Sequence, residues 1–361
     1  MAGTGGAAPW GTIPDNANIT LCFLSPTDVD DLGWSFWHNK ARIESYARIV
    51  KMFPTLHIKS SWHPNFISGG DKTQALLAII AAEKCDAVTS LSVSNYIGVD
   101  IDAIANAHPN VQFTHFSRGD VYVTTHADNF AAFGIDIENA WYVLGAAAGG
   151  QSKTCVGFAY PVSTLKLAVN AFQRGMLSVN SKVKLYATEL GSFYNPEGET
   201  KMAELFIEKG CDVILSWTDT RRAAGVVHDY NKKNRSSGVF SIGYAADVAT
   251  FTGDSVLSSL YLDIEDLLFN QTKDYLTGKY RTPHIVEIGQ GIIVPRTSPA
   301  ADPAATAGRE TAWNRVASGA DDIFCSAIKN STGHVVKPAG TSDEACLRGK
   351  LRATAFHHFE E

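Results

Sequence analysis

The sequence predicts an α/β fold made of two lobes, each with a mostly parallel sheet covered by helices. The chain has 361 residues, which exceeds one small core and suits two lobes of roughly 100–200 residues each. From Ile19 onward, short apolar runs alternate with longer helical patterns, as is typical of βαβ units. The same order of elements then occurs a second time, which indicates two lobes of similar construction.

The first series of elements forms most of the first lobe. Apolar runs predict strands at 19–24, 56–60, 87–91 and 111–116. Apolar residues recurring three and four positions apart predict helices at 33–52, 70–84 and 101–108.

The second series begins after 140–150, a small-residue helical stretch that we expect to stop at Gly149 and Gly150. The segment 84–88 resembles the segment 209–213, and both occur at the same position in the order of elements of their series. The predicted strands are 154–159, 183–188, 213–217 and 239–242, and the predicted helices are 164–178, 196–208 and 220–230.

The last part of the chain is expected to cross between the lobes again. Residues 255–268 are expected to return to the first lobe, followed by a helix ending near Thr277, and 289–294 to lead back. From Pro295 we expect loops, a short strand wrapping the second lobe and a helical segment containing Trp313. The predicted first lobe is 16–139 with 255–285, the second is 140–254 with 286–361, and a ligand cleft lies between them.

Composition argues against several classes of function. The net charge of −6 and a pI near 6.0 offer no basic field for phosphates, so nucleic acid is not an expected partner. No run of about 18 uncharged apolar residues occurs, so no helix is expected to span a membrane. The first residues lack the basic and apolar regions of a signal peptide, which leaves export open.

The six cysteines show no CxxC and no zinc spacing with histidine, so we expect neither a metal nor a redox cofactor. Four of them lie in or beside apolar runs, where cysteine commonly acts as a small buried hydrophobe: Cys22, Cys85, Cys155 and Cys211. Cys325 and Cys346 lie in the polar tail, where a disulfide would fasten a loop with little core. Two free thiols are the alternative for that pair.

Ligands of open parallel sheets bind beyond the carboxyl ends of the strands, so the residues that follow each strand are informative. After the first strand, Asp30 and Asp31 precede three aromatic residues within 34–37. Adjacent acids at a helix start commonly cap the helix, but one helix face cannot bury three such rings. In the second lobe, the residues in equivalent places are Tyr160, Phe193, Trp217 and Asp219.

Aromatic residues from two lobes can hold a planar ring, while acids or amides beside them read its edge through hydrogen bonds. The alternative is that these aromatic residues pack the lobes together. Enzyme motifs are absent: the sequence has no GxGxxG after the first strand, P-loop, GxSxG or HExxH. Histidines such as His115 and His126 are read as structural groups. A nucleoside-processing hydrolase using Asp30, Asp31 and a histidine is the rival interpretation.

Six segments occur in the order expected of one family: 30–38, 156–161, 170–180, 193–196, 217–220 and 323–329. They include DDLGWSFWH, VGFAYP, NAFQRG, FYNP, WTDT and IFCSAIK. On these motifs the chain resembles the basic membrane protein (BMP) family, the purine and nucleoside substrate-binding proteins of ABC importers.

The resemblance implies a type I periplasmic-binding-protein fold with a three-crossover hinge and a base stacked between aromatics of both lobes. It assigns stacking to Trp34 and to Phe193 or Trp217, with Asp31 as an acceptor for the base edge or ribose. The further expected ligand-binding residues are Ser35, Tyr96, Tyr160, Asp219 and Asp247. It also implies a monomer that is periplasmic, extracellular or membrane-associated, works with an ABC permease and does no chemistry.

One departure from the family pattern concerns the ligand. Many relatives carry Gly-x-Asp-x-Asp after the last strand of the second lobe, where this chain has Gly243-Tyr244-Ala245-Ala246-Asp247. The resemblance implies that the first acid of this pattern binds the ribose of a nucleoside, and this chain has Ala245 at that position. This favours a free purine base such as adenine over a nucleoside. A ligand-sensing receptor without a transporter is the remaining alternative, whereas a sugar-binding regulator would need a DNA-binding helix-turn-helix for which no residues are left.

Overall fold

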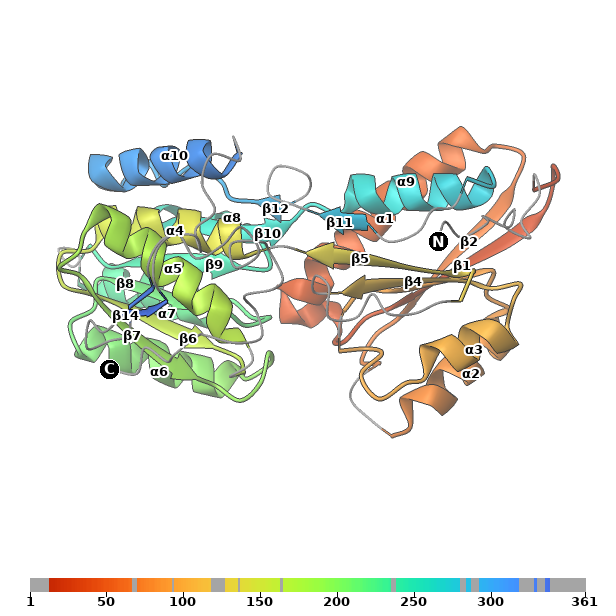
Figure 1. The fold of residues 1–361 in the computed structure, drawn as a ribbon, viewed down its shortest axis with the longest axis horizontal. Helices are drawn as coiled ribbons and strands as arrows, with labels where there is room; N and C mark the ends of the chain where they lie inside the picture. The colour runs from red at the N-terminus through yellow and green to blue at the C-terminus, as the bar shows by residue number, and fades with distance from the viewer. Residues whose placement is uncertain are drawn as a thin grey trace. The chain divides into compact units, whose positions relative to one another are not determined.

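Each half of the chain folds around its own six-stranded sheet (Figure 1). The computed structural model describes residues 13–66, 70–92, 94–117, 127–135, 137–162, 165–234, 238–279, 284–286, 292–317, 328–329 and 335–337. The first unit comprises Met1–Asp31, Ser35–Asp136 and Asp263–Val286, and the second comprises Leu32–Trp34, Ile137–Leu262 and Glu287–Glu361.

The sheet of the first unit has the strand order β11-β5-β4-β3-β1-β2, and all its neighbouring strands are parallel. Its strands are β1 (Asn18–Leu24), β2 (His57–His63), β3 (Ala87–Ser90), β4 (Gln112–Ser117), β5 (Phe130–Ile135) and β11 (His284–Val286). Its helices are α1 (Trp34–Met52), α2 (Lys72–Glu83), α3 (Ile101–Ala107) and α9 (Glu265–Leu276), of which α1 begins with a residue of the second unit.

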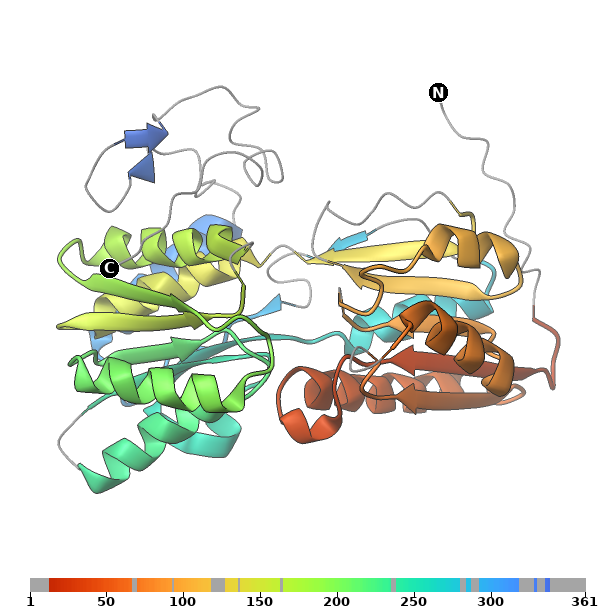
Figure 2. The ribbon, with the colours of Figure 1, turned by 90° about the horizontal axis from the view of Figure 1, so that it is seen from below.

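Helices cover both faces of this sheet (Figures 1 and 2). On one face α1 lies beside α9, and Arg48 of α1 pairs with Glu265 (2.9 Å) and Asp266 (2.6 Å) of α9. On the other face α2 and α3 bury apolar side chains such as Leu76 and Ile104 against the strands. Burial on both faces explains why these strands read as apolar runs rather than as an alternating pattern.

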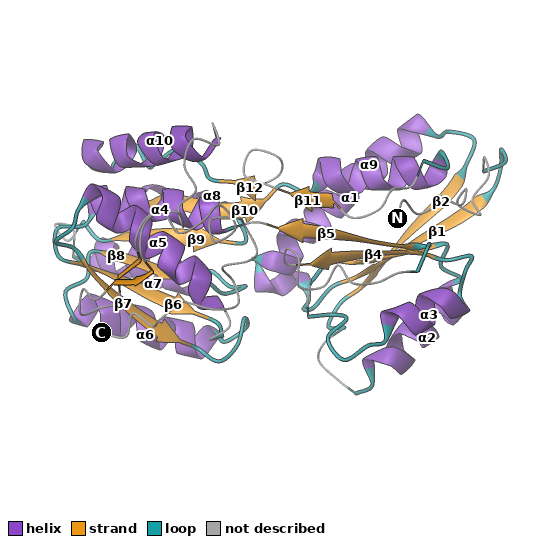
Figure 3. Cartoon of the chain, viewed as in Figure 1, coloured by secondary structure: helices purple, strands orange, loops and turns teal. Residues whose placement is uncertain are grey.

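The second sheet has the strand order β12-β10-β9-β8-β6-β7 and is parallel except for the β10–β12 pair. Its strands are β6 (Cys155–Tyr160), β7 (Lys184–Glu189), β8 (Val213–Ser216), β9 (Phe240–Tyr244), β10 (Val256–Leu262) and β12 (Ile292–Ile293). Its helices are α4 (Glu138–Gln151), α5 (Lys166–Val179), α6 (Pro196–Glu208), α7 (Arg222–Lys233), α8 (Ala249–Thr252) and α10 (Pro303–Ala317). β13 (Ile328–Lys329) and β14 (Val335–Lys337) form a separate antiparallel pair, and Figure 3 colours helices and strands differently.

The small residues of α4 allow it to pack directly on α5. A Cβ atom at Gly145 would lie 1.9 Å from the carbonyl oxygen of Phe172, and one at Gly149 would lie 2.3 Å from that of Met176. The expected helix end at Gly149 and Gly150 is confirmed to within one residue, because α4 ends at Gln151. Gly145 and Gly149 therefore serve close helix packing.

The predicted α/β fold with parallel sheets in two lobes is confirmed, and the predicted strands of both series match β1 to β4 and β6 to β9 within a few residues. Two parts of the expected order are corrected. Residues 130–135, for which no strand was predicted, form β5. Residues 256–262 form β10 within the second sheet, so the return to the first unit begins at Asp263 and not at 255.

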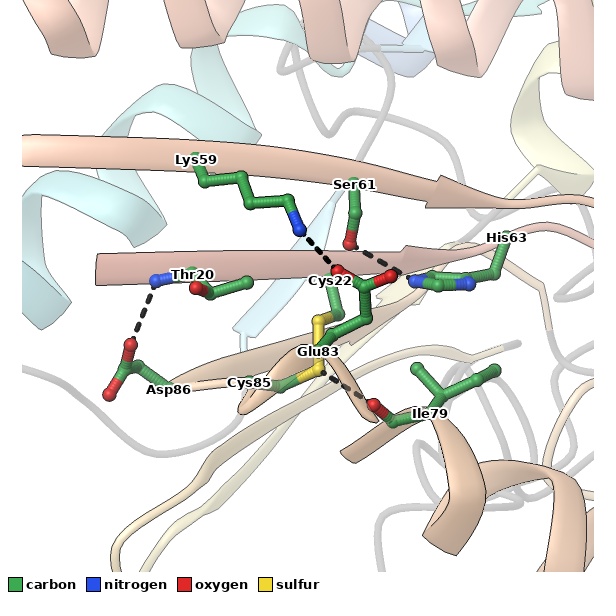
Figure 4. The surroundings of a disulfide bond; sticks show 9 residues. All are labelled: Thr20, Cys22, Lys59, Ser61, His63, Ile79, Glu83, Cys85 and Asp86. Carbon is green, nitrogen blue, oxygen red and sulfur yellow. Dashed lines mark hydrogen bonds and ion pairs between the residues drawn. A yellow bond between two sulfur atoms is a disulfide. The ribbon is translucent and has the colours of Figure 1, made fainter. Parts of the chain in front are cut away.

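The four cysteines expected to be buried hydrophobes are buried, but they form two disulfides, Cys22–Cys85 and Cys155–Cys211 (Figure 4 shows the first). The reason is strand adjacency. Cys22 lies in β1 and Cys85 just before its neighbour β3, while Cys155 is the first residue of β6 and Cys211 lies just before its neighbour β8. The Cα atoms are 5.9 Å and 4.5 Å apart, within disulfide range. Cys325 and Cys346 lie outside the described residues.

Within the described residues, no helix combines the length and the apolar character needed to cross a membrane.

Candidate functional site

In the first unit, the loop after β1 is organised by the carboxylate of Asp31. This side chain accepts hydrogen bonds from the backbone N–H groups of Ser35 (2.7 Å) and Phe36 (3.1 Å) and from the hydroxyl of Thr27 (2.8 Å). The Ser35 hydroxyl in turn lies 2.6 Å from that of Thr27. Asp31 therefore caps α1, which is the alternative role that the sequence pattern had left open.

A second polar group lies at the carboxyl ends of β3 and β4. Nδ1 of His115 lies 3.0 Å from the hydroxyl of Ser90, and the imidazole stacks on Tyr96 with 4.8 Å between ring centroids. His115 is buried, and this burial lowers its pKa to about 3. The ring is therefore neutral at physiological pH and acts as a hydrogen-bonding structural group. His126 lies outside the described residues.

In the second unit, aromatic rings gather at the carboxyl edge of the sheet. Tyr244, the last residue of β9, stacks on Trp34 with 6.4 Å between centroids and 22° between planes. Its ring also stacks on Trp141 (5.8 Å, 19°) and meets Trp217 edge-on (5.9 Å, 64°). All four side chains are buried, so these rings form one packed aromatic cluster.

The segment that carries Trp34 lies against the loop after β8. A Cβ atom at Gly33 would lie 2.0 Å from the backbone oxygen of Asp219, so only glycine allows this approach. The N–H of Asp219 donates to the carbonyl oxygen of Phe193 (2.8 Å). Gly33, Phe193 and Asp219 thus lie together within the second unit.

Glu199 is a buried acid that is hydrogen-bonded to the segment after β8. Glu199, in the first turn of α6, is 1% exposed, and its carboxylate accepts hydrogen bonds from the Thr220 hydroxyl and the Ala223 N–H (2.9 Å). Burial raises its pKa to about 7, although these hydrogen bonds and nearby Arg222 act in the opposite direction. Glu199 therefore links α6 to the start of α7 and to the loop bearing Trp217 and Asp219.

The nine expected ligand-binding residues are divided between the two units. Asp31, Ser35 and Tyr96 belong to the first, and Trp34, Tyr160, Phe193, Trp217, Asp219 and Asp247 belong to the second. Tyr160 is the buried last residue of β6. Asp247 is half-buried before α8 and has no side-chain contact to the aromatic cluster among the contacts of the described residues.

Sequence reasoning missed three residues of this region. Tyr244 belongs to the turn in which Ala245 replaces the first acid of many relatives, and its place at the end of a strand was the available signal. Trp141 lies in α4, which was predicted from its small residues, and nothing in the sequence indicates that it contacts the end of β9. Glu199 resembles any acid in the first turn of a helix. Across the described ranges, no three or more His, Cys, Asp or Glu side chains gather as metal ligands would.

The architecture is that of periplasmic solute-binding proteins of the type I fold. A solute-binding protein from Conexibacter woesei superposes with a TM-score of 0.65 at 17% identity, covering 84% of this chain and 97% of that one. One from Aeropyrum pernix gives a TM-score of 0.64 at 14% identity, covering 84% and 92%. At this identity these structures establish the fold alone.

The sequence comparison identifies the family. Residues 22–294 match the family model of the PnrA-like ABC transporter substrate-binding proteins (Bmp), and the chain belongs to this family. A purine-binding protein of Brucella abortus is 26% identical over 343 residues, which are 93% of this chain and 91% of that protein. Proteins of this family bind small molecules in the periplasm or outside the cell and work with ABC permeases.

Proposed function

We propose that this protein captures a purine base, with adenine as the best candidate, for ABC-type uptake. The observation that carries the proposal is the gathering of Trp34, Tyr244 and Trp217 at the carboxyl edge of the second sheet, because ligands of parallel sheets bind at that edge and aromatic residues suit a flat heteroaromatic ligand. The purine-binding relative from Brucella abortus supports the same ligand class.

The turn after β9 favours a base over a nucleoside. Ala245 and Ala246 are both buried and offer no carboxylate to the hydroxyls of a sugar. The acid of this turn, Asp247, lies two residues after Ala245 and is half-buried. Binding of a nucleoside would leave its polar ribose without the charged partner that would repay its desolvation.

We infer binding without catalysis. The rival hydrolase would need Asp31 or Asp30 as an acid or base beside a histidine. The carboxylate of Asp31 is occupied by two backbone N–H groups and a hydroxyl as a helix cap, and Asp30 is exposed. His115 is held neutral and bonded to Ser90. These roles support a receptor rather than an enzyme.

The two disulfides support maturation outside the cytosol, where such bonds form and persist. This agrees with the location of the family.

The test is a thermal-shift panel of adenine, guanine, hypoxanthine and their nucleosides. A ligand at about 100 times its Kd should raise the free energy of unfolding by about 2.7 kcal/mol. Adenine is expected to give the largest shift and adenosine a smaller one. If no member of the panel shifts the transition, the ligand is not a purine.

A further inference from the structure

Glu199 is a buried acid to which the expected ligand contacts give no role. It lies in the first turn of α6 and is 1% exposed. One oxygen of its carboxylate accepts a hydrogen bond from the N–H of Ala223 (2.9 Å), and the other accepts from the hydroxyl of Thr220. The side chain of Thr218 also hydrogen-bonds to this carboxylate. Three donors from one stretch of chain therefore converge on a single buried group.

These hydrogen bonds hold both ends of the segment that connects β8 to α7. The hydroxyl of Ser216, the last residue of β8, lies 3.0 Å from that of Thr218, so a chain of hydroxyls leads from the strand to Glu199. At the other end, Ala223 belongs to the first turn of α7. The segment between these ends follows the carboxyl end of a parallel strand, where ligands of such sheets bind. Glu199 therefore fixes a part of the chain that is suited to ligand binding.

The same segment carries two of the expected ligand-binding residues. Trp217 meets the ring of Tyr244 edge-on, with 5.9 Å between centroids. The N–H of Asp219 donates to the carbonyl oxygen of Phe193 (2.8 Å). Trp217 and Asp219 alternate along the chain with the two threonines that bond Glu199. A change in the hydrogen bonds of Glu199 therefore acts on residues next to both.

The protonation state of Glu199 determines which hydrogen bonds its neighbours can make. An ionised carboxylate only accepts, which matches the three donors, whereas a carboxylic acid carries an O–H that one threonine hydroxyl must turn to accept. Hydrogen bonds to the ionised form are also stronger. Burial raises the pKa of Glu199 to about 7, and Arg222 at the start of α7 is the charged neighbour that acts in the opposite direction. Thr218 and Thr220 do not titrate, so the two forms of Glu199 exchange near neutral pH.

We propose that Glu199 is a positioning residue for ligand binding, whose ionised carboxylate holds the segment bearing Trp217 and Asp219 in its binding geometry, so that adenine binds more weakly when this carboxyl is protonated. This inference rests on the proposed function, because it assumes that a purine contacts this segment. It gives a role in binding to a residue that lies outside the motifs shared with the family.

The experiment measures the Kd of adenine by calorimetric titration between about pH 5.5 and about pH 8.5, a range in which adenine itself stays neutral. In the unaltered protein the Kd should rise about fivefold as the pH falls through 7, which is the lower end of ordinary coupling between two sites. Glutamine has nearly the shape of the protonated acid and cannot ionise. Glu199→Gln should therefore bind adenine with the weaker affinity at every pH.

Glu197→Gln is the matched control, because Glu197 is an exposed acid in the same turn of α6. Its Kd should follow the pH profile of the unaltered protein. A Kd of the unaltered protein that does not change with pH would overturn the inference and leave the proposed function standing, as would a pH profile that persists in Glu199→Gln. If the unaltered protein binds no purine at any pH, the proposed function fails and the inference fails with it.

A second readout tests the link between Glu199 and this segment without a ligand. The indole N–H resonance that disappears from the NMR spectrum of Trp217→Phe belongs to Trp217. In the unaltered protein this resonance should move with pH with a midpoint near 7, and in Glu199→Gln it should stay fixed. A Trp217 resonance that does not respond to pH, or that responds equally in both proteins, would contradict the proposal.

Discussion

The backbone of Gly33 lies so close to Asp219 that a Cβ atom at position 33 would be 2.0 Å from the carbonyl oxygen of Asp219. Gly33→Ala should therefore force the loop after β8 or the start of α1 to move. We expect a loss of about 1–3 kcal/mol of folding stability, as for other overpacked sites, measured by denaturant unfolding. Purine binding should weaken as well, because Trp34 is the next residue.

Gly225→Ala is the control for this substitution. Gly225 lies within α7 and a Cβ atom there would meet nothing within 4 Å. This variant should be neutral or slightly more stable, because alanine favours a helix over glycine by up to about 1 kcal/mol. If the two variants behave alike, the close approach at Gly33 is not a constraint.

Trp34→Ala tests the stacking residue that both the sequence and the structure emphasise. Removal of an aromatic ring that stacks on a base should cost roughly 1–3 kcal/mol of binding, or about tenfold or more in Kd. Because Trp34 also packs on Tyr244, folding stability should fall too, by up to about 3–5 kcal/mol if the packing role dominates. Titration of the folded fraction separates the two effects, and an unchanged Kd would place the ligand elsewhere.

Glu199 predicts a pH dependence of folding stability. Its folded pKa of about 7 lies above the ordinary value of 4.5, so the folded state favours the protonated form. The stabilisation this gives is complete below about pH 4.5 and is lost as the pH rises through 7. The difference between the two pKa values corresponds to on the order of 3 kcal/mol in the free energy of unfolding, since one pKa unit is worth about 1.4 kcal/mol.

The measurement compares the unfolding of the unaltered protein with that of Glu199→Gln between pH 5 and pH 8. Glutamine cannot ionise, so the unaltered protein should lose stability relative to this variant as the pH rises. Glu204→Gln, at an exposed position of the same helix, should show no such trend. A stability difference that stays constant over this range would mean that Glu199 does not titrate there.

The two disulfides predict the outcome of thiol counting on denatured, unreduced protein matured outside the cytosol. The chain has six cysteines, and the four residues of Cys22–Cys85 and Cys155–Cys211 should not react. Two reactive thiols would leave Cys325 and Cys346 free, and none would mean that they are bonded as well. Six would contradict both observed bonds.

Replacing Cys22 and Cys85 together by serine should lower the free energy of unfolding by about 4 kcal/mol on the chain-entropy model, since the bond closes a sequence separation of 63 residues. Adenine binding should be unaffected, because Cys85 precedes β3 and so lies at the amino end of the sheet.

Much of the fold follows from the sequence alone because strands buried on both faces are read directly as apolar runs. β1 and β8, for example, are bounded by polar turns and have no competing helical pattern. β5 was missed because FAAFGI is rich in small residues. β10 was joined to α9 because its apolar run continues into the acids that begin that helix.

The candidate site was less accessible to sequence reasoning, because contacts between distant segments leave no local pattern. Trp34 and Trp217 were found because each lies in a segment that follows a predicted strand, where ligands of parallel sheets bind. Their common neighbour Tyr244 depends on the position of β9 beside β8, and the disulfides depend on β1 lying beside β3. Such relationships arise from sheet order, which single runs of residues do not specify.

Calorimetric titration of the unaltered protein with adenine, followed by chromatography of the recovered ligand, tests the central claim most directly. We predict saturable binding to a single site per chain, with adenine returned unchanged. The same titration and chromatography with adenosine should show weaker binding and no free adenine as product. Absence of binding by every purine tested, or conversion of adenosine to its base, would contradict the account.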